Sequence, residues 1–551
     1  MATKSNFKWD EIGSNNPIFS QLRTTIETPF YGNNVVKINS LREAYKLAAA
    51  SPGTIVTDMP VYKPEAIGLD SDAKVLLFND GAVRGRAAAA RRILGEPGVD
   101  EGEYALKVSE AIYQTRFKKM YHAQVYVGLD EDFMVRANLL IPEGQENIMY
   151  SWMLNFQYLT DEYFNMYQRS TTLQNEGDIY VFSDPTWSHP DHPMGLTCFD
   201  PKHNCAAILG MRYFGEHKKG TLTLAWAIAN RNGYASCHGG QKRYNLADGT
   251  KFVAGVFGLS GSGKSTITHA RHNDKYDITV LHDDAFVIST ENGSSVALEP
   301  AYFDKTQDYP LNSEDNKFLV TVQNNGATID DQGNVVLLTE DIRNGNGRAV
   351  KSKLWSPNRV DKFDEPVNAI FWLMKDPTLP PIVKLRGAEL ASVMGATLAT
   401  KRTSAERLAP GVDPNALVVE PYANPFRTYP LADDYNKFKA LFAERNVDCY
   451  ILNTGHFMDK KVTPAVTLAA LEAVVEGKAT FKPWGKFTDI EIMEIDGFIP
   501  NLEDKEYAHQ LQERMKDRIR YIESCETAKG GFDKLPEEAL EALKKVVAEL
   551  E

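Results

Sequence analysis

The stretch Lys251-Phe-Val-Ala-Gly-Val-Phe-Gly-Leu-Ser-Gly-Ser-Gly-Lys-Ser-Thr266 decides the fold prediction for this chain. Residues 252–257 are apolar and short enough for a buried strand. Residues 258–265 match the phosphate-loop pattern G-x-x-x-x-G-K-[ST], and residues 266–270 are typical of a helix start. Strand, loop and helix therefore follow in the order that a phosphate-binding loop requires. A Gly/Ser-rich turn between two elements is the alternative, and it does not require this order.

The residue types of the loop indicate how it would hold a nucleoside triphosphate. Its glycines allow backbone torsions that let successive N–H groups converge on an anion. Lys264 adds a positive charge at the outer phosphates, and Ser265 offers a hydroxyl to a magnesium ion. The dipole of the following helix favours the same anion. The predicted nucleotide-binding residues of the loop are Gly258, Ser260, Gly261, Ser262, Gly263, Lys264, Ser265 and Thr266.

Length and composition indicate a globular protein of two large domains. The chain has 551 residues, more than one core usually supports, and 43% of them are hydrophobic. A net charge of −13 argues against a nucleic-acid binder, whose surface would be basic. We expect a substrate-binding domain over residues 1–233 and a phosphate-loop domain over residues 234–551.

The cysteines and the hydropathy pattern predict a soluble cytoplasmic protein. Five cysteines without C-x-x-C spacing favour reduced thiols over a disulfide framework or a zinc site. The N-terminus lacks an apolar run typical of a signal peptide. No segment approaches the roughly 20 apolar residues of a membrane span. The expected state is a monomer or a small homo-oligomer without nucleic-acid or membrane partners.

Alternating helix and strand patterns predict the α/β class. An alanine-rich helix is expected up to Leu94, a second helix from Glu110 to Tyr121, and an irregular surface loop over residues 186–203. The other expected helices cover residues 464–476, 505–524 and 535–550. Strands are expected at residues 75–78, 123–127, 277–281, 369–374 and 448–453, with hairpin-like sequence reaching residue 350.

Two adjacent carboxylates, Asp283 and Asp284, end the apolar strand Ile278-Thr-Val-Leu-His. Alone, such a pair is typical of a solvated turn. About 20 residues after a phosphate loop it predicts metal ligation, because a cation that bridges phosphates prefers carboxylate oxygens. The two carboxylates repel each other, so a site with two cations suits them better than a site with one.

Upstream of the loop, Tyr213-Phe-Gly-Glu-His-Lys218-Lys219-Gly220 is followed by Cys237-His238-Gly-Gly. In this order, with the loop and the Asp pair behind them, the segments resemble the ATP-dependent phosphoenolpyruvate carboxykinase family. The resemblance covers about residues 75–480, is strongest over 213–305, and identifies the chain as a divergent member. It implies a two-domain α/β fold whose C-terminal domain carries the phosphate loop.

The resemblance implies a manganese site formed by Lys219, His238 and Asp284. A lysine ligand must be neutral, which costs roughly 4–5 kcal/mol at pH 7 from its free pKa. A nearby dication and the adjacent Lys218 would both disfavour the charged form. A magnesium ion with the nucleotide is expected near Ser265 and Asp283.

The resemblance also implies roles for residues outside these segments. Ser260 lies near the transferred phosphoryl group, and Arg343 of Glu340-Asp-Ile-Arg faces it. Lys305 of Glu299-Pro-Ala-Tyr-Phe-Asp-Lys is expected near CO₂. Arg86, with Arg84 as the alternative, Tyr213 and Arg343 are expected to bind oxaloacetate. Lys461 and Thr467 are expected to contact the nucleotide. Lys461 stands where the family has an arginine, whose planar guanidinium can stack on a ring and form two parallel hydrogen bonds, whereas a lysine ammonium cannot.

The implied activity is conversion of oxaloacetate and ATP into phosphoenolpyruvate, ADP and CO₂, in gluconeogenesis or in the reverse, carboxylating direction. GTP remains an alternative nucleotide. The altered segments 80–90 and 299–305 motivate a second hypothesis, a kinase on the same scaffold that phosphorylates another small molecule or a protein. A third, a catalytically silent nucleotide-binding regulator, predicts loss of the metal ligands, yet all three are present.

Overall fold

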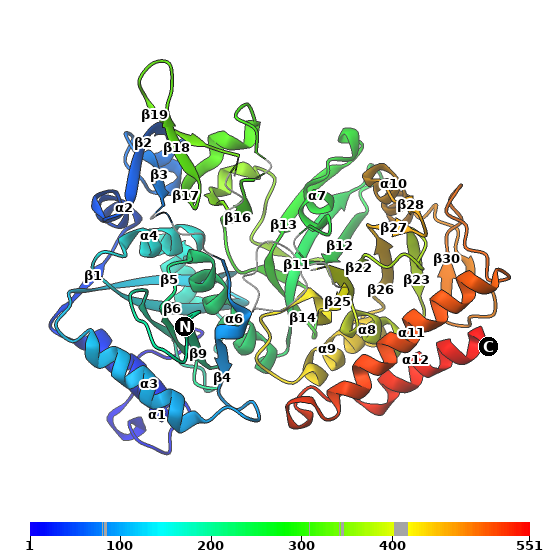
Figure 1. The fold of residues 1–551 in the computed structure, drawn as a ribbon, viewed down its shortest axis with the longest axis horizontal. Helices are drawn as coiled ribbons and strands as arrows, with labels where there is room; N and C mark the ends of the chain where they lie inside the picture. Colours follow the sequence, from blue (N-terminus) through cyan, green and yellow to red (C-terminus); the bar gives the residue numbers. More distant parts are fainter. Residues whose placement is uncertain are drawn as a thin grey trace.

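The computed structural model describes residues 1–79, 81, 85–259, 261–307, 309–340, 342, 346–401 and 417–551. Figure 1 shows two sheet-containing parts side by side, with the N-terminal part on the left and the part that holds β12, β22 and β26 on the right; β16 to β19 lie on the left with the N-terminal part. Helices and strands alternate through both, which confirms the α/β class.

Eight of the described strands form the sheet of the first part, in the order β1-β5-β6-β8-β10-β9-β4 with β7 on β5. Helices α1, α3, α4, α5 and α6 accompany this sheet. The bounds are β1 Val35–Ile38, β4 Arg91–Ile93, β5 Met120–Asp130, β6 Phe133–Pro142, β7 Gln157–Tyr158, β8 Ile179–Asp184, β9 Leu196–Asp200, β10 Cys205–Leu209, α1 Gln21–Glu27, α3 Glu101–Gln114, α4 Glu146–Asn155, α5 Asp161–Arg169 and α6 Phe214–Arg231.

Eleven described strands form the second sheet, in the order β21-β15-β14-β11-β12-β22-β26-β23-β30-β29 with β13 on β11. Its centre is parallel, because β12 pairs parallel with β22 and β22 with β26. Such strands are buried on both faces, which explains their apolar runs. The bounds are β11 Tyr234–Asn245, β12 Lys251–Phe257, β13 Asp277–His282, β14 Ala285–Ser289, β15 Ser295–Ala297, β21 Lys362–Phe363, β22 Ala369–Met374, β23 Ile382–Leu385, β26 Asp448–Asn453, β29 Lys482–Pro483 and β30 Ile490–Ile492.

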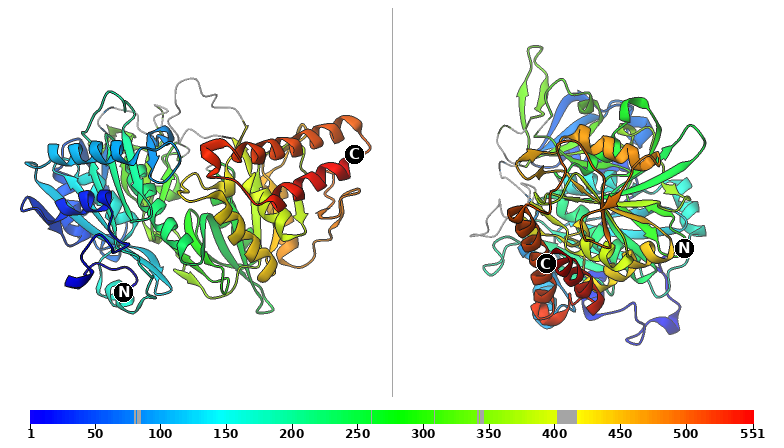
Figure 2. Two further views of the ribbon diagram at one scale, coloured as in Figure 1. Left: turned by 90° about the horizontal axis from the view of Figure 1, so that it is seen from below. Right: turned by 90° about the vertical axis from the view of Figure 1, so that its right-hand side faces the viewer.

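Helices cover this second sheet, and the last two lie side by side along one end of the molecule (Figure 2). The three helices expected after residue 460 are present with nearly the expected ends. The bounds are α7 Lys264–His269, α8 Ala388–Ala396, α9 Leu431–Glu444, α10 Pro464–Val475, α11 Lys505–Cys525 and α12 Glu537–Leu550.

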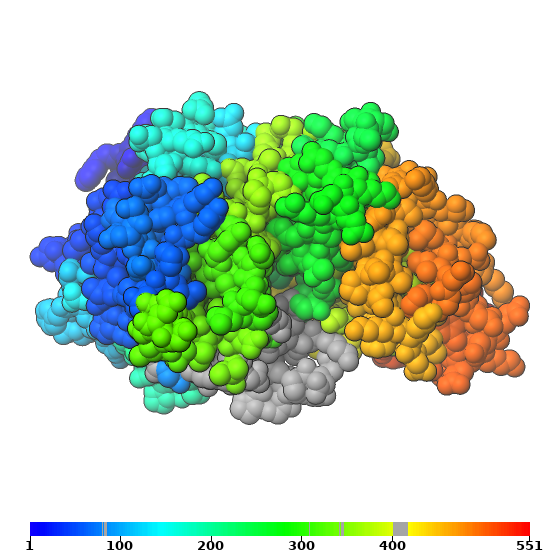
Figure 3. All heavy atoms as spheres, turned by 90° about the horizontal axis from the view of Figure 1, so that it is seen from above, coloured from blue at the N-terminus to red at the C-terminus, as the bar shows by residue number. Residues whose placement is uncertain are grey.

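A smaller sheet of order β16-β20-β17-β3-β2 takes strands from both sides of residue 233. Figure 3 shows the green residues around 300–350 packed against the blue N-terminal residues. The domain boundary near 233 therefore stays a prediction. The bounds are β2 Thr54–Pro60, β3 Lys74–Phe78, β16 Tyr302–Lys305, β17 Leu319–Gln323 and β20 Arg348–Lys351, and helix α2, Leu41–Ala50, lies nearby. Three separate two-stranded sheets are formed by β18 Gly326–Ile329 with β19 Val335–Leu338, by β24 Ala399–Lys401 with β25 Leu417–Val419, and by β27 His456–Phe457 with β28 Lys460–Lys461.

Three sequence-based expectations for the first part were wrong. The alanine-rich segment before Leu94 forms one 3-10 turn and then strand β4, which pairs with β9. The helix expected over Glu110 to Tyr121 is α3, which ends at Gln114, and Met120 already begins β5. Residues 196–200 of the expected loop form the buried strand β9. In each case the segment pairs with a strand that is distant in the sequence, and this pairing overrides the local propensity for helix or loop.

All five cysteines are buried and none forms a disulfide. Within the described ranges, no helix is both long and apolar enough to cross a membrane.

Candidate active site

A cavity of about 480 Å³ opens where β12, β13, β16 and the start of α6 meet. Segments more than 300 residues apart in the sequence line it. The fold therefore gathers most of the residues that sequence reasoning singled out. Those that line the cavity are Arg86, Tyr213, Lys219, His238, Gly261, Gly263, Lys264, Ser265, Thr266, Asp283, Asp284 and Lys305.

The phosphate loop follows β12, the central strand of the second sheet. Gly261 and Gly263 have φ angles of 82° and 93°, a left-handed backbone that glycine adopts without strain. A Cβ on Gly258 would lie 2.3 Å from the Ser262 hydroxyl, so this close approach also requires glycine. Ser262 is buried against the loop and does not line the cavity. Ser260 lies outside the described residues.

Strand pairing brings His238 of β11 to Asp284. His238 pairs with Ala285 of β14, and the Gly239 N–H donates to the Asp284 carbonyl at 3.2 Å. The side chain Nε2 of His238 then lies 3.0 Å from Asp284 Oδ1. A pairing register, not a sequence motif, thus creates this contact.

Three lysines surround the Asp284 carboxylate. Its Oδ2 accepts from Lys218 Nζ at 2.6 Å and from Lys219 Nζ at 2.7 Å. Its Oδ1 accepts from Lys264 Nζ at 3.2 Å. Burial opposes ionisation of Asp284, but the three ammonium groups outweigh it and hold its pKa well below the usual range. Asp284 is therefore the anionic centre of the site.

Lys218 and Lys219 are adjacent in sequence, but their pKa values shift in opposite directions. Lys218 is fully buried and also lies 2.9 Å from Glu299 Oε1. Burial opposes its charge, but Asp284 and Glu299 outweigh burial and raise the pKa of Lys218. Burial instead lowers the pKa of Lys219 to about 7, with Lys218 and Lys264 adding to the shift and Asp284 opposing it. Lys219 can therefore supply a neutral amine near neutral pH.

His238 presents a lone pair to the carboxylate. Its Nδ1 bonds to the Ala423 carbonyl, which can only accept, so Nδ1 carries the proton. Burial and the charges of Lys219 and Lys264 lower the pKa of His238 to about 3, so Nε2 is unprotonated. An imidazole lone pair and a carboxylate oxygen thus face each other at 3.0 Å. This arrangement suits a bridging cation.

The donor set at this point fits a transition-metal dication. An amine near its pKa, a neutral imidazole and a carboxylate offer nitrogen and oxygen ligands. Within the described ranges, no three His, Cys, Asp or Glu side chains form a metal-binding group, so a site here depends on the lysine. Manganese at Lys219, His238 and Asp284 stays a prediction that the donor chemistry supports.

Asp283 points to a different neighbour. Its Oδ2 lies 3.4 Å from Nε2 of His269, the last residue of α7. Burial opposes ionisation of Asp283, but His269 outweighs it and lowers the Asp283 pKa below its usual range. Asp283 and Ser265 both line the cavity, so a hard cation beside the phosphates would find oxygen ligands there.

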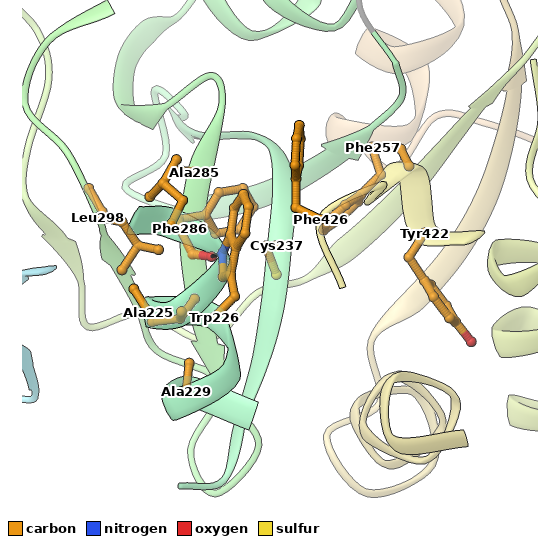
Figure 4. Close-up of a cluster of buried hydrophobic side chains, with 14 of the residues drawn as sticks. Ala225, Trp226, Ala229, Cys237, Phe257, Ala285, Phe286, Leu298, Tyr422 and Phe426 are labelled. Carbon is orange, nitrogen blue, oxygen red and sulfur yellow. Dashed lines mark hydrogen bonds between the residues drawn. The ribbon is translucent and has the colours of Figure 1, made fainter. Parts of the chain in front are cut away.

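Phe426, which lines the cavity, is in contact with three positive side chains. The guanidinium groups of Arg86 and Arg91 each lie 5.0 Å from its ring centroid, and Lys219 Nζ lies 4.8 Å from it. Figure 4 shows Phe426 in one buried cluster with Trp226. Such cation–π contacts hold charged groups in place. Arg91 is in addition paired with Glu216 at 2.9 Å. No motif in the sequence pointed to Phe426.

Arg348 is a second residue that sequence reasoning missed. It is buried, lines the cavity, and donates from Nε to the Tyr213 hydroxyl at 3.1 Å. Arg343, the predicted phosphoryl-facing residue, and Arg84, the alternative to Arg86, lie outside the described residues. Only the position of Arg348 in strand β20, opposite Lys305 of β16, could have indicated that it faces the site.

Lys305 lines the cavity beside the unexpected acid Asp304. Asp304 Oδ1 accepts from the Lys305 backbone N–H at 2.9 Å, and Oδ2 accepts from Lys351 Nζ at 2.9 Å and from the Tyr309 hydroxyl. The buried Lys351 thus offsets the acid. Asp304 orders the backbone of Lys305 instead of adding an uncompensated charge.

The two predicted contacts to the nucleotide base do not line this cavity. Lys461 lies exposed in the short strand β28. Thr467 is buried in α10, and its hydroxyl lies 3.4 Å from the Thr463 carbonyl in the same helix. Their role in nucleotide binding stays a prediction.

We expect the Glu299→Gln variant to lose roughly 3 kcal/mol of unfolding free energy, because it leaves the buried Lys218 with one acidic partner. Glu299 also accepts from Asn155 Nδ2 at 2.6 Å, a bond that glutamine can keep. Urea titration measures the change. The matched control is Glu143→Gln, which removes an exposed pair with Lys119 and should cost about 1 kcal/mol or less. Equal losses in the two variants would contradict the buried pairing.

Comparisons with known proteins agree with the resemblance. A family model described as phosphoenolpyruvate carboxykinase matches residues 65–495, more than half of the chain. The phosphoenolpyruvate carboxykinase (ATP) of Aeropyrum pernix is 27% identical over 347 residues, 59% of this chain and 68% of that protein. That of Bradyrhizobium sp. strain ORS 278 is 24% identical over 396 residues, 66% and 68% of the two chains. A glycosomal relative from Trypanosoma brucei brucei is 23% identical over 455 residues, 75% and 90% of the two.

Proposed function

This chain belongs to the ATP-dependent phosphoenolpyruvate carboxykinase family, and on that premise we propose that it converts oxaloacetate and ATP into phosphoenolpyruvate, ADP and CO₂. One observation carries the proposal. Lys219, His238 and Asp284 meet the phosphate-loop Lys264 in a single cavity. Phosphoryl transfer and binding of a carboxylic acid need such a combination of fixed positive groups and a metal-binding carboxylate.

We propose that Lys219, His238 and Asp284 hold Mn²⁺, and that Asp283 and Ser265 serve a Mg²⁺ that accompanies the nucleotide. A bound dication supplies Lewis acidity, which draws electron density from a substrate oxygen. Lys219 suits this role because burial lowers its pKa and so favours the neutral amine, which can bind a metal. The Ala423 carbonyl keeps the proton of His238 on Nδ1 and so leaves Nε2 available.

Arg86, held over the Phe426 ring, binds the dicarboxylate. Arg86 lines the cavity and suits a two-point hold on a carboxylate. Arg348 fixes the Tyr213 hydroxyl, which also faces the cavity. The nearby Lys305 neutralises the carboxylate that leaves as CO₂. Loss of CO₂ generates an enolate, so the nucleophile forms without a general base.

The enolate oxygen then attacks the γ-phosphoryl group of the nucleotide. The loop glycines direct backbone N–H groups at the phosphates, and Lys264 neutralises charge as the phosphoryl group passes in line. Lys264 Nζ donates to Asp284 Oδ1 at 3.2 Å, so the phosphate loop and the proposed manganese ligands meet at this contact. Roles for Ser260 and Arg343 next to the phosphoryl group rest on the family resemblance.

A kinase acting on another substrate is the second candidate, because the segment at the predicted CO₂ site is altered and Asp304, although offset by Lys351, lines the cavity next to Lys305. Incubation with oxaloacetate, Mn²⁺ and ATP or GTP separates the two. We expect phosphoenolpyruvate to form only when oxaloacetate and nucleotide are both present. Absence of phosphoenolpyruvate with either nucleotide would remove the carboxykinase proposal. Absence of nucleotide binding in calorimetry would remove the kinase as well.

The preferred nucleotide, the direction of the reaction and the oligomeric state stay predictions, as does the cytoplasmic location. One relative, that of Trypanosoma brucei brucei, is named glycosomal.

A further inference from the structure

A second pocket, of about 550 Å³, lies outside the catalytic cavity. It is formed by the turn at residues 62–63, by Arg271 just after α7, and by residues 315–359. Four cationic side chains line it, Lys63, Arg271, Lys353 and Arg359, with a single acid, Asp315. This concentration of positive charge occurs in a chain of net charge −13.

The acids near this pocket are already engaged. Asp315 Oδ1 accepts from Trp355 Nε1 at 2.7 Å, and its Oδ2 lies 3.6 Å from Lys351. Arg359 pairs with Asp361 at 2.6 Å. Three cations are therefore left without compensation from these carboxylates.

Lys63, Arg271 and Lys353 have no carboxylate oxygen within 4.0 Å anywhere in the part of the chain that the structure describes. Lys63 Nζ lies 5.3 Å from the Tyr62 ring centroid. Like charges gathered in a concave surface repel one another and raise the local concentration of anions. An anionic ligand would relieve that repulsion.

The backbone at Lys63 is held in an unfavourable conformation. Its φ and ψ are 44° and 57°, a left-handed region that non-glycine residues seldom adopt. Such strain persists where the surroundings determine it, and it is common at ligand-binding positions. Lys63 and its neighbour Tyr62 both line the pocket.

Aromatic walls define the rest of the pocket. Tyr62 and Phe318 meet edge to face with ring centroids 5.5 Å apart, and Trp355 belongs to the same lining. Pockets of 300 to about 1,000 Å³ take small molecules, and aromatic faces favour planar groups. Cations bind phosphate oxygens with charge-assisted hydrogen bonds.

We propose that this second pocket binds a small phosphorylated molecule, with the phosphate held by Lys63, Arg271 and Lys353 and a planar group against the aromatic walls. The site is separate from the phosphate loop. It lies close to it, since the Trp355 ring is 4.3 Å from that of His269 at the end of α7. The proposal does not depend on the carboxykinase reaction.

Calorimetric titration tests the proposal in a Lys264→Ala background, where the phosphate-loop site is disabled. The probes are inorganic phosphate, pyrophosphate and AMP. We expect one binding event for AMP or pyrophosphate, weakened by added salt because the contacts are ionic. If the aromatic walls receive the base, AMP binds more tightly than inorganic phosphate.

Two further variants identify the pocket. Adding Arg271→Gln and Lys353→Gln should weaken binding at least tenfold. Adding Lys202→Gln and Lys544→Gln instead removes two exposed charges elsewhere and should leave the affinity unchanged. Absence of binding in the Lys264→Ala protein, or equal affinity in the two sets, would overturn the proposal. If the first pair destabilises the fold, the single Lys353→Gln change makes the same comparison.

Discussion

The Lys219→Arg variant should lose about 10³-fold in kcat/KM for phosphoenolpyruvate formation, although it keeps a positive charge. The reason is that a guanidinium does not deprotonate and so cannot offer a lone pair to a dication. Loss of a ligand that supports Lewis acidity costs several kcal/mol, and about 4 kcal/mol corresponds to this factor. Initial rates with oxaloacetate, ATP and Mn²⁺ measure the effect.

Mn²⁺ affinity gives a readout independent of turnover. The pKa of Lys219 is about 7, so below that pH the dication must displace a proton. In the unaltered protein we expect the affinity, followed by electron paramagnetic resonance of free Mn²⁺, to fall about tenfold per pH unit below 7. The arginine variant should bind weakly at every pH and should lack this proton-linked slope.

The control is Lys118→Arg, the same substitution at a half-exposed lysine paired with Asp184. It should leave both rate and Mn²⁺ affinity unchanged. Retained activity in Lys219→Arg would mean that residue 219 acts as a cation, and the metal assignment would fail.

The second large effect is expected from Lys264→Ala, with kcat reduced roughly 10³-fold. Lys264 is nearly buried and reaches Asp284, so its charge acts in a region where water screens it little. Removing a group that neutralises a transferring phosphoryl group costs about 10³- to 10⁵-fold in related chemistry. The rate of phosphoenolpyruvate formation at saturating ATP measures this loss, and calorimetry gives the accompanying loss of ATP affinity.

Lys275→Ala serves as the matched control for Lys264→Ala. Lys275 lies in the same part of the chain, is half-exposed, and pairs with Glu472 and Glu476 outside the cavity. Its removal should change kcat less than twofold. If both lysine variants were equally active, Lys264 would have no role in phosphoryl transfer. The calorimetric ATP affinity would then show whether the phosphate loop binds the nucleotide at all.

Local sequence patterns predicted the parts of the molecule whose conformation is decided within a few residues. The phosphate loop is one, because glycine torsions and the flanking strand are short-range properties. The strand that ends in Asp283 and Asp284 is another. The same reasoning was wrong near Leu94, where pairing of β4 with β9 overrode the helix propensity of alanine.

The adjacent residues Lys218 and Lys219 show that such patterns do not predict the charge state of a buried side chain. The motif singles out Lys219 as a ligand but gives no sign of how the two lysines titrate, yet the pKa of Lys218 is raised and that of Lys219 is lowered. The difference arises because Glu299 of a distant segment pairs directly with Lys218, whereas at Lys219 burial and the charges of Lys218 and Lys264 outweigh the acids. Charge state depends on burial and on neighbours in space, which a one-dimensional pattern does not contain.

The sequence alone thus determined the α/β class, the phosphate loop and, through its motif order, the family and the metal-binding candidates. The tertiary structure decided how these residues are charged and oriented: the β11–β14 register that brings His238 to Asp284, the Ala423 carbonyl that fixes the His238 proton, and the Arg348–Tyr213 contact. The physical reason is range. Backbone torsions and strand periodicity act over a few residues, whereas desolvation and electrostatic pairing act between groups that only the folded chain brings together.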